Sequence, residues 1–154
     1  MALRPTRSSA HPNAPAPAPV SLPLEIGIHL PRAWTLTKTF RFEAAHHLPA
    51  HDGKCRRVHG HSWVGDVEVR GTHLEPDGPK QGMVVDYGDI SAAVDPIVES
   101  TLDHYDLNES TGLRNPTSEA IARWLFDLLV EQVPGLIAVT IHETCTSRCR
   151  YARD

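Results

Sequence analysis

Apolar and polar residues alternate along several short stretches of this chain, a pattern typical of half-buried strands. The alternation runs through Thr35–His46, through Ser62–Arg70 and again through Ala138–Thr144. A short final strand is possible near Arg148–Tyr151. These stretches predict a small set of strands.

Between the second and third strands, apolar residues recur at spacings of three and four, which is typical of amphipathic helices. The first helix should follow Asp86, a good N-cap, and extend to about residue 101, although Pro96 must either kink it or break it. The second should begin near Thr117, which can cap it. We expect one stripe of that second helix to face the core: Ile121, Trp124, Leu125, Leu128 and Leu129.

The order of these elements, ββααββ, predicts an α+β fold in which a four-stranded antiparallel sheet carries two helices on one face. The 154 residues are enough for one domain, which we place at residues 32–154. Residues 1–31 hold seven of the 13 prolines, so we expect a disordered Pro/Ala-rich tail. An organelle transit peptide is the alternative for this segment.

Charge and cysteine content narrow the classes of function. Fifteen Lys and Arg against 19 Asp and Glu give a net charge of -4, without a long basic run. This balance argues against a nucleic-acid surface and against a polybasic membrane anchor. No apolar run is long enough for a membrane span. Three cysteines are too few for a disulfide framework, so we expect a reducing, cytoplasmic setting.

The candidate chemistry gathers around three histidines. His59 and His61 are two residues apart, so on a strand they point the same way, and His46 can arrive on a neighbouring strand. Three imidazoles suit Zn²⁺ and leave a fourth position for water or substrate. The alternative is a chance pairing, because the chain has ten histidines. His47 competes with His46, but alternation turns it to the opposite face.

Cys55 lies in a loop four residues before His59, between Lys54 and two arginines, Arg56 and Arg57. Nearby cations stabilise a thiolate, which makes this cysteine a candidate base or nucleophile. These cations are also positioned to attract an anionic substrate. The alternative is a buried small residue in a solvated basic loop.

Two acidic positions are also candidates. Asp103 precedes His104, and a carboxylate can orient an imidazole for proton transfer, although a helix cap with a surface histidine is the ordinary interpretation. Glu143 shares a strand face with two apolar residues, which favours a ligand-facing acid over a solvated glutamate at a strand end.

Five short motifs match a known family in order. They are Phe42–His46 (FEAAH), Cys55–His61 (CRRVHGH), Leu102–His104 (LDH), Asn115–Glu119 (NPTSE) and Glu143–Thr146 (ETCT). From about Thr35 to Tyr151, the chain resembles the 6-pyruvoyl-tetrahydropterin synthase family. It is most similar to the branch that makes 6-carboxy-5,6,7,8-tetrahydropterin for queuosine and other 7-deazaguanines.

The resemblance implies a tunnelling fold, assembled as a homo-hexamer of two trimers with active sites between subunits. It implies zinc bound by His46, His59 and His61. The substrate would be 7,8-dihydroneopterin triphosphate, and acetaldehyde and triphosphate would be released.

By the same resemblance, Cys55 accepts a proton, Asp103 and His104 form an assisting relay, and Glu143 grips the pterin. Thr117 and Ser118, at a helix N-terminus, are expected to contact the same ring. Two alternatives stay open: a pyruvoyl-forming or side-chain-cleaving enzyme of the same family, and a non-catalytic zinc-binding, cupin-like module.

Overall fold

A computed structural model describes residues 32–153 of the chain, so the predicted tail at residues 1–31 lies outside the described residues. The described residues form one sheet of four antiparallel strands in the order β1-β2-β3-β4. The strands are β1 (Trp34–His46), β2 (His59–Gly71), β3 (Leu136–Thr144) and β4 (Ser147–Ala152). The predicted strands are therefore confirmed, and β2 begins three residues earlier than expected.

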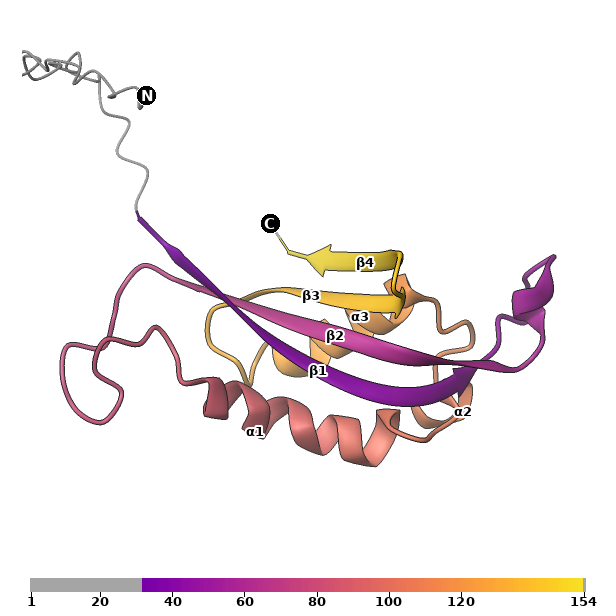
Figure 1. The fold of residues 1–154 in the computed structure, drawn as a ribbon, viewed down its shortest axis with the longest axis horizontal. Helices are drawn as coiled ribbons and strands as arrows, with labels where there is room; N and C mark the ends of the chain where they lie inside the picture. The colour runs from indigo at the N-terminus through magenta and orange to yellow at the C-terminus, as the bar shows by residue number, and fades with distance from the viewer. Residues whose placement is uncertain (1–31, 154) are drawn as a thin grey trace, which may run out of the picture. The chain divides into compact units, whose positions relative to one another are not determined.

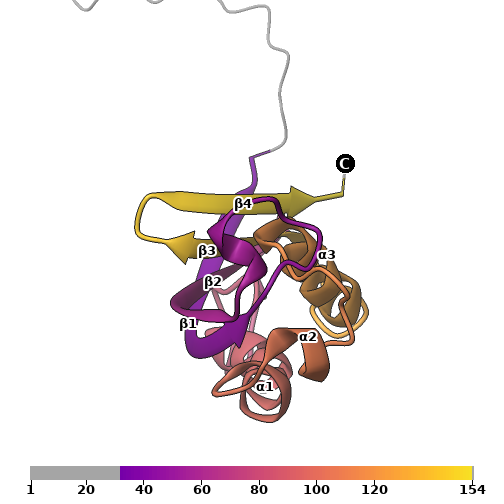
Figure 2. The same cartoon turned by 90° about the vertical axis from the view of Figure 1, so that its right-hand side faces the viewer.

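The helical segments lie between β2 and β3. They are α1 (Tyr87–Ile97), the π-helix η2 (Val98–Leu102), the short α2 (Leu107–Ser110) and α3 (Ser118–Leu129). A 3₁₀ turn, η1 (Lys54–Arg56), lies in the loop between β1 and β2. Figures 1 and 2 show α1 and α3 on the same side of the sheet, which confirms the predicted α+β fold.

The core lies between these helices and one face of the sheet. Alternate residues of the strands, such as Phe42, Trp63 and Ile141, are buried against Ile90 of α1 and Leu125 of α3. Burying such large apolar side chains is the main force that holds the two layers together.

One predicted detail of the helices needs correction, and a second is now defined. The buried stripe of α3 consists of Ile121, Ala122, Leu125, Phe126 and Leu129. Trp124 is only partly buried and Leu128 is exposed, so the predicted stripe was rotated toward solvent. Pro96 lies one residue before the end of α1, and the chain continues directly into the π-helix η2, so the α-helical pattern ends at the predicted proline.

Asp86 and Thr117 act as the N-caps that the sequence predicts. The carboxylate of Asp86 accepts a hydrogen bond from the Gly88 N–H at 2.8 Å, and the hydroxyl of Thr117 accepts one from the Ala120 N–H at 3.2 Å. Such bonds satisfy N–H groups that the first helical turn leaves unpaired. In the described part of the chain, no helix is long and apolar enough to cross a membrane.

Candidate metal centre and its pockets

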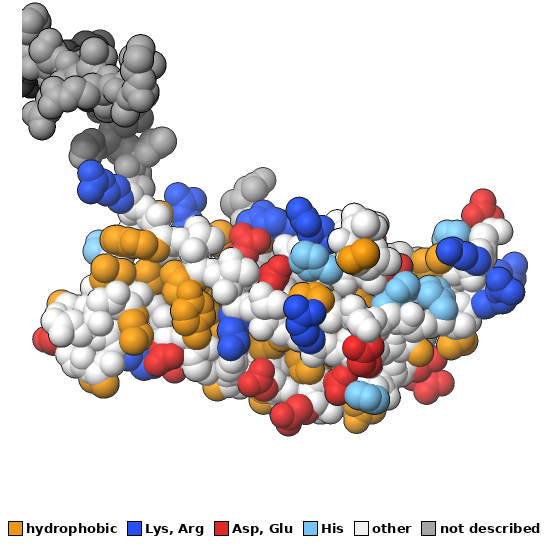
Figure 3. Space-filling model, viewed as in Figure 1, with side chains coloured by type: hydrophobic (Ala, Val, Ile, Leu, Met, Phe, Trp, Pro, Cys, Tyr) orange, Lys and Arg blue, Asp and Glu red, His pale blue; other side chains and the backbone are white. Residues whose placement is uncertain are grey.

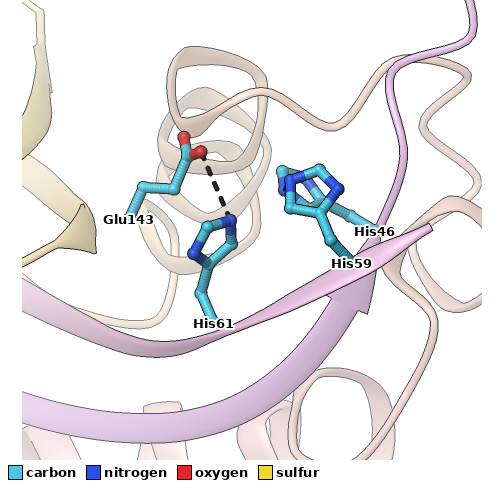
Figure 4. A group of neighbouring side chains, drawn as sticks. All are labelled: His46, His59, His61 and Glu143. Atoms are coloured by element: carbon cyan, nitrogen blue, oxygen red, sulfur yellow. Dashed lines mark hydrogen bonds and ion pairs between the residues drawn. The ribbon is translucent and has the colours of Figure 1, made fainter. Parts of the chain in front are cut away.

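Strand pairing brings the three predicted histidines together. In the β1–β2 register, His46 lies opposite His59, and Ala44 lies opposite His61. Because side chains alternate along a strand, all three imidazoles emerge on the face that carries the helices. The ring centroid of His46 lies 4.5 Å from that of His59 and 5.2 Å from that of His61. Figure 4 shows the rings gathered at one end of the sheet, with Glu143 reaching toward them.

Backbone carbonyl groups fix the orientation of two of these rings. The Nδ1 of His46 donates to the carbonyl oxygen of Pro116 at 2.8 Å, and the Nδ1 of His59 donates to that of Arg57 at 2.8 Å. A carbonyl oxygen only accepts, so the proton of each neutral ring must be on Nδ1. Each Nε2 is then an acceptor with a free lone pair.

The two Nε2 atoms of His46 and His59 face each other at 3.1 Å. Two acceptors at this distance cannot form a hydrogen bond with each other, and their lone pairs repel. The Nε2 of His61 is also buried and makes no hydrogen bond within the described residues. A cation between the three nitrogens would satisfy all of them at once, which is the arrangement that a metal site needs.

Glu143 completes this group. Its Oε1 lies 3.4 Å from the Nε2 of His61. A bulge in the β3–β4 pairing, between His142 and Thr144, lies at this position. Together the three imidazoles and the carboxylate offer four donor atoms that all lie within 4.8 Å of one another, a set that could hold a metal ion.

Burial favours the neutral forms of His46 and His61. Loss of hydration lowers the pKa of His46, and the hydrogen bond to Pro116 offsets this only in part. Loss of hydration also lowers the pKa of His61, against the opposing effect of Glu143. Because only a neutral imidazole has a lone pair for a metal, these shifts favour binding near pH 7.

Cys55 lies in the wall of the pocket beside the histidines. This pocket has a volume of about 600 Å³ and is lined by Lys54, Cys55, Arg57, Val58, His59, His61, Glu143 and Thr144. Cys55 is half-buried, and its thiol is free. The structure therefore places the predicted thiol in one pocket with two of the predicted zinc ligands.

Asp103 and His104 lie on another side of His61. The Oδ2 of Asp103 is 2.8 Å from the Nδ1 of His104, so these neighbours do contact each other. The Oδ1 of Asp103 accepts the N–H of Glu43 at 2.8 Å. That backbone bond, followed by the contact with His104, holds the pKa of Asp103 below its usual value and keeps it ionised. His104 has a φ of 65°, which is uncommon for a residue other than glycine.

His104 lines a second pocket of about 480 Å³, together with Glu43, His61, Ser62 and neighbouring residues. His61 is the residue that both pockets share, whereas Cys55 lines only the first of these two pockets and His104 only the second. Glu43 and Ser62, which hydrogen-bond to each other at 2.8 Å, alternate with the core-facing positions of their strands. Because Ala44 and His61 belong to the core-facing positions, the second pocket is lined by residues from both faces of the sheet.

The remaining candidates lie near the centre. The hydroxyl of Thr117 caps α3, and the Oγ of Ser118 lies 3.5 Å from Glu119. Among the described residues, neither lines the pocket of Cys55. His47 also stays outside the histidine group, and its backbone N–H and carbonyl both bond to Asn108 at 2.9 Å.

Sequence reasoning missed the two carbonyl groups that orient the ligands, those of Arg57 and Pro116. No side-chain pattern indicates them, since every residue has a carbonyl. Only the folded loops show which ones face a histidine.

Comparisons with known proteins agree with this geometry. The profile of the family described as 6-pyruvoyl tetrahydropterin synthase matches residues 35–154. The chain is 55% identical over 119 residues to a 6-carboxy-5,6,7,8-tetrahydropterin synthase of Synechocystis, covering 77% of this chain and 92% of that protein. A Haemophilus influenzae protein of the same name is 31% identical over 137 residues, which cover 75% of this chain and 96% of the relative.

A solved structure shows the same fold. The 6-pyruvoyl tetrahydropterin synthase of Caenorhabditis elegans superposes with a TM-score of 0.68 at 28% identity, covering 80% of this chain and 97% of that one.

Proposed function

This chain belongs to the 6-pyruvoyl tetrahydropterin synthase family, and we propose that it converts 7,8-dihydroneopterin triphosphate to 6-carboxy-5,6,7,8-tetrahydropterin. Acetaldehyde and triphosphate are the other products. The 55% identity to the Synechocystis protein of that name supports this branch of the family over the pyruvoyl-forming branch. The product would serve queuosine and 7-deazaguanine synthesis.

One observation carries the proposal: a thiol, three inward-facing imidazole nitrogens and a carboxylate converge on neighbouring surfaces of one chain. We propose that His46, His59 and His61 hold Zn²⁺, since their donor set and spacing fit that ion. A bound zinc ion would supply a Lewis acid for the oxygens of the substrate side chain.

The remaining roles follow from the positions of the side chains. Cys55, in the pocket wall, accepts a proton from the substrate side chain. His104 exchanges a proton at Nε2, because Asp103 engages its Nδ1 and leaves Nε2 as the free ring nitrogen. Glu143 accepts two parallel hydrogen bonds from the pterin N–H and amino group. Thr117 and Ser118 approach the same ring from the N-terminus of α3.

The test is to incubate zinc-loaded protein with 7,8-dihydroneopterin triphosphate and identify the pterin product by mass. We expect the 6-carboxy product together with acetaldehyde. A 6-pyruvoyl product would assign the chain to the other branch, and no turnover by zinc-loaded protein would favour a binding module. The cupin-like form of that alternative expects no paired helices, and the helices α1 and α3 on the sheet contradict it.

A further inference from the structure

A short basic turn forms one wall of the pocket that contains Cys55. The turn comprises η1 (Lys54–Arg56) and the residue after it, Arg57. In Figure 3, Lys and Arg side chains gather at the end of the molecule where Figure 1 places the loop between β1 and β2. The proposed function assigns no role to these cations.

The geometry of the turn separates the three cations into two groups. The N–H of Arg57 donates to the carbonyl of Lys54 at 3.1 Å, which closes a 3₁₀ turn. In such a turn, side chains three residues apart lie on the same side. All three side chains are exposed, but Lys54 and Arg57 line the pocket, whereas Arg56 is not part of that lining.

Backbone bonds fix this turn against the histidines. The carbonyl of Arg57 accepts the Nδ1–H of His59 at 2.8 Å, and the carbonyl of Cys55 accepts the N–H of Leu48 at 2.9 Å. The turn is thus attached to the end of β1 on one side and to a predicted zinc ligand on the other. The two pocket cations therefore keep a defined position relative to the site.

The charges of these two side chains are available to a ligand. Over residues 32–153, no Asp or Glu lies within ion-pair distance of Lys54 or Arg57. The nearest acid in the sequence, Asp52, is exposed and lies 3.7 Å from the Nδ1 of His51 instead. Unpaired cations at the rim of a pocket attract and bind phosphate groups.

We propose that Lys54 and Arg57 form a phosphate subsite that binds the triphosphate of the substrate, supplied by the same chain whose Cys55 faces the pterin side chain. This subsite rests on the proposed function, because that function supplies a triphosphate ester. Arginine can bind two phosphate oxygens in parallel, and lysine adds a point charge. The subsite selects for the triphosphate form of the pterin, and Arg56 contributes only general attraction.

Single alanine substitutions at positions 54, 56 and 57 test the division between pocket and surface. We expect Lys54→Ala and Arg57→Ala each to raise the KM for dihydroneopterin triphosphate by about tenfold, the loss expected for one charge-assisted hydrogen bond. Arg56→Ala is the matched control, with a change below about twofold. Arg57→Lys should recover part of the loss. Equal effects at all three positions, or no effect at 54 and 57, would overturn the subsite.

A binding measurement separates this proposal from the proposed reaction. Calorimetry with inorganic triphosphate on zinc-loaded protein needs no turnover, and the metal content and Tm of each variant are measured alongside. Weaker binding in Lys54→Ala and Arg57→Ala than in Arg56→Ala supports the subsite even if the product assay fails. Identical binding by all three variants rejects it even if the product assay succeeds.

Discussion

Backbone hydrogen bonds fix the orientation of two of the three histidines in the centre. The carbonyl oxygens of Pro116 and Arg57 accept hydrogen bonds from the Nδ1–H groups of His46 and His59. The Nε2 lone pairs of these rings therefore face inward. Outer partners of this kind orient metal ligands in many proteins. The orientation of these two rings is thus set before any ligand binds.

The adjacent histidines at 46 and 47 give a matched test of the centre. We expect His46→Ala to weaken zinc binding by more than about 100-fold, since even outer partners of ligands contribute 10–100-fold. His47→Ala should keep its zinc, because the contacts of His47 to Asn108 come from its backbone. Zinc content after gel filtration measures both variants.

His46 is fully buried, so His59→Ala, which removes a half-buried ring, provides a second variant. It should lose zinc as His46→Ala does. Zinc retained at full occupancy in His59→Ala would contradict the three-histidine site.

Glu143 has two possible uses, as a fourth metal donor or as the acceptor for the pterin ring, and Glu143→Gln separates them. We expect this variant to retain zinc and to raise the KM by about 10–100-fold, because an amide cannot accept two parallel hydrogen bonds from the ring. Metal analysis and kinetics on one preparation give both values. Loss of zinc would make Glu143 a ligand instead.

Alternation along the sequence was enough to choose His46 over His47 and to place Glu143 on the face of Val139 and Ile141. It could not show that the side chain of Glu143 approaches His61, because this depends on the fold of β3 around the bulge near residue 143. Nor could the sequence show that Asp103 and His104 contact each other, since neighbours in a chain often point apart.

At the scale of elements, η2 determines where the Asp103–His104 pair lies. Pro96 has no N–H to contribute to the hydrogen bonds of an α-helix. The chain then continues as a wider π-helix, in which the N–H of Asp103 donates to the carbonyl of Val98 at 2.8 Å. The segment that follows lies along β1, where the N–H of Ala45 donates to the carbonyl of Tyr105 at 3.0 Å. The sequence identified the proline, but a kink, a break and a widened turn all fit it.

An ion pair connects β2 and β4 across β3 and gives the fold a pH dependence. Arg150 donates two hydrogen bonds to Glu68, at 2.7 and 2.9 Å, and these bonds lower the pKa of Glu68 from 4.5. A carboxylate whose pKa is lowered by folding stabilises the fold above its unfolded pKa. That contribution is lost as the pH falls through the folded value.

We therefore expect Glu68→Gln to lower the free energy of unfolding by about 0.5–1 kcal/mol at pH 7, a modest figure because the guanidinium is exposed to solvent. The difference from the parent should shrink as the pH falls below 4.5 and through the lowered pKa of Glu68. Urea unfolding at several pH values measures it, with Glu131→Gln as an exposed control. A difference that does not change with pH would point to lost packing rather than lost charge.

At the scale of the molecule, the sheet of a single chain has two edge strands, β1 and β4. In the described part of the chain, the outer edge of β4 has no partner strand, and β1 is covered only where residues 103–106 lie against it. Open edges are suited to pairing with another copy. We propose that β1 of one copy pairs with β4 of the next, as the hexamer of two trimers implied by the sequence resemblance would require.

The division of the site into two pockets favours the same assembly. Cys55 lines one of the two pockets beside His61, whereas His104 lines the other. A substrate held by one subunit would then meet Cys55 of that subunit and His104 of a neighbour. We propose that each complete active site uses both.

Mixing two inactive variants tests this arrangement. Cys55→Ala and His104→Ala should each lower kcat by about 10²–10⁴-fold, the usual contribution of a proton-transfer group. Refolded together in equal amounts, they should recover about a quarter of the parent activity, because random pairing of subunits leaves that fraction of sites with both groups intact. Mixing Cys55→Ala with the double variant should recover nothing, since no site then contains Cys55. If the first mixture also stays inactive while its oligomers are shown to be mixed, both groups must act within one subunit.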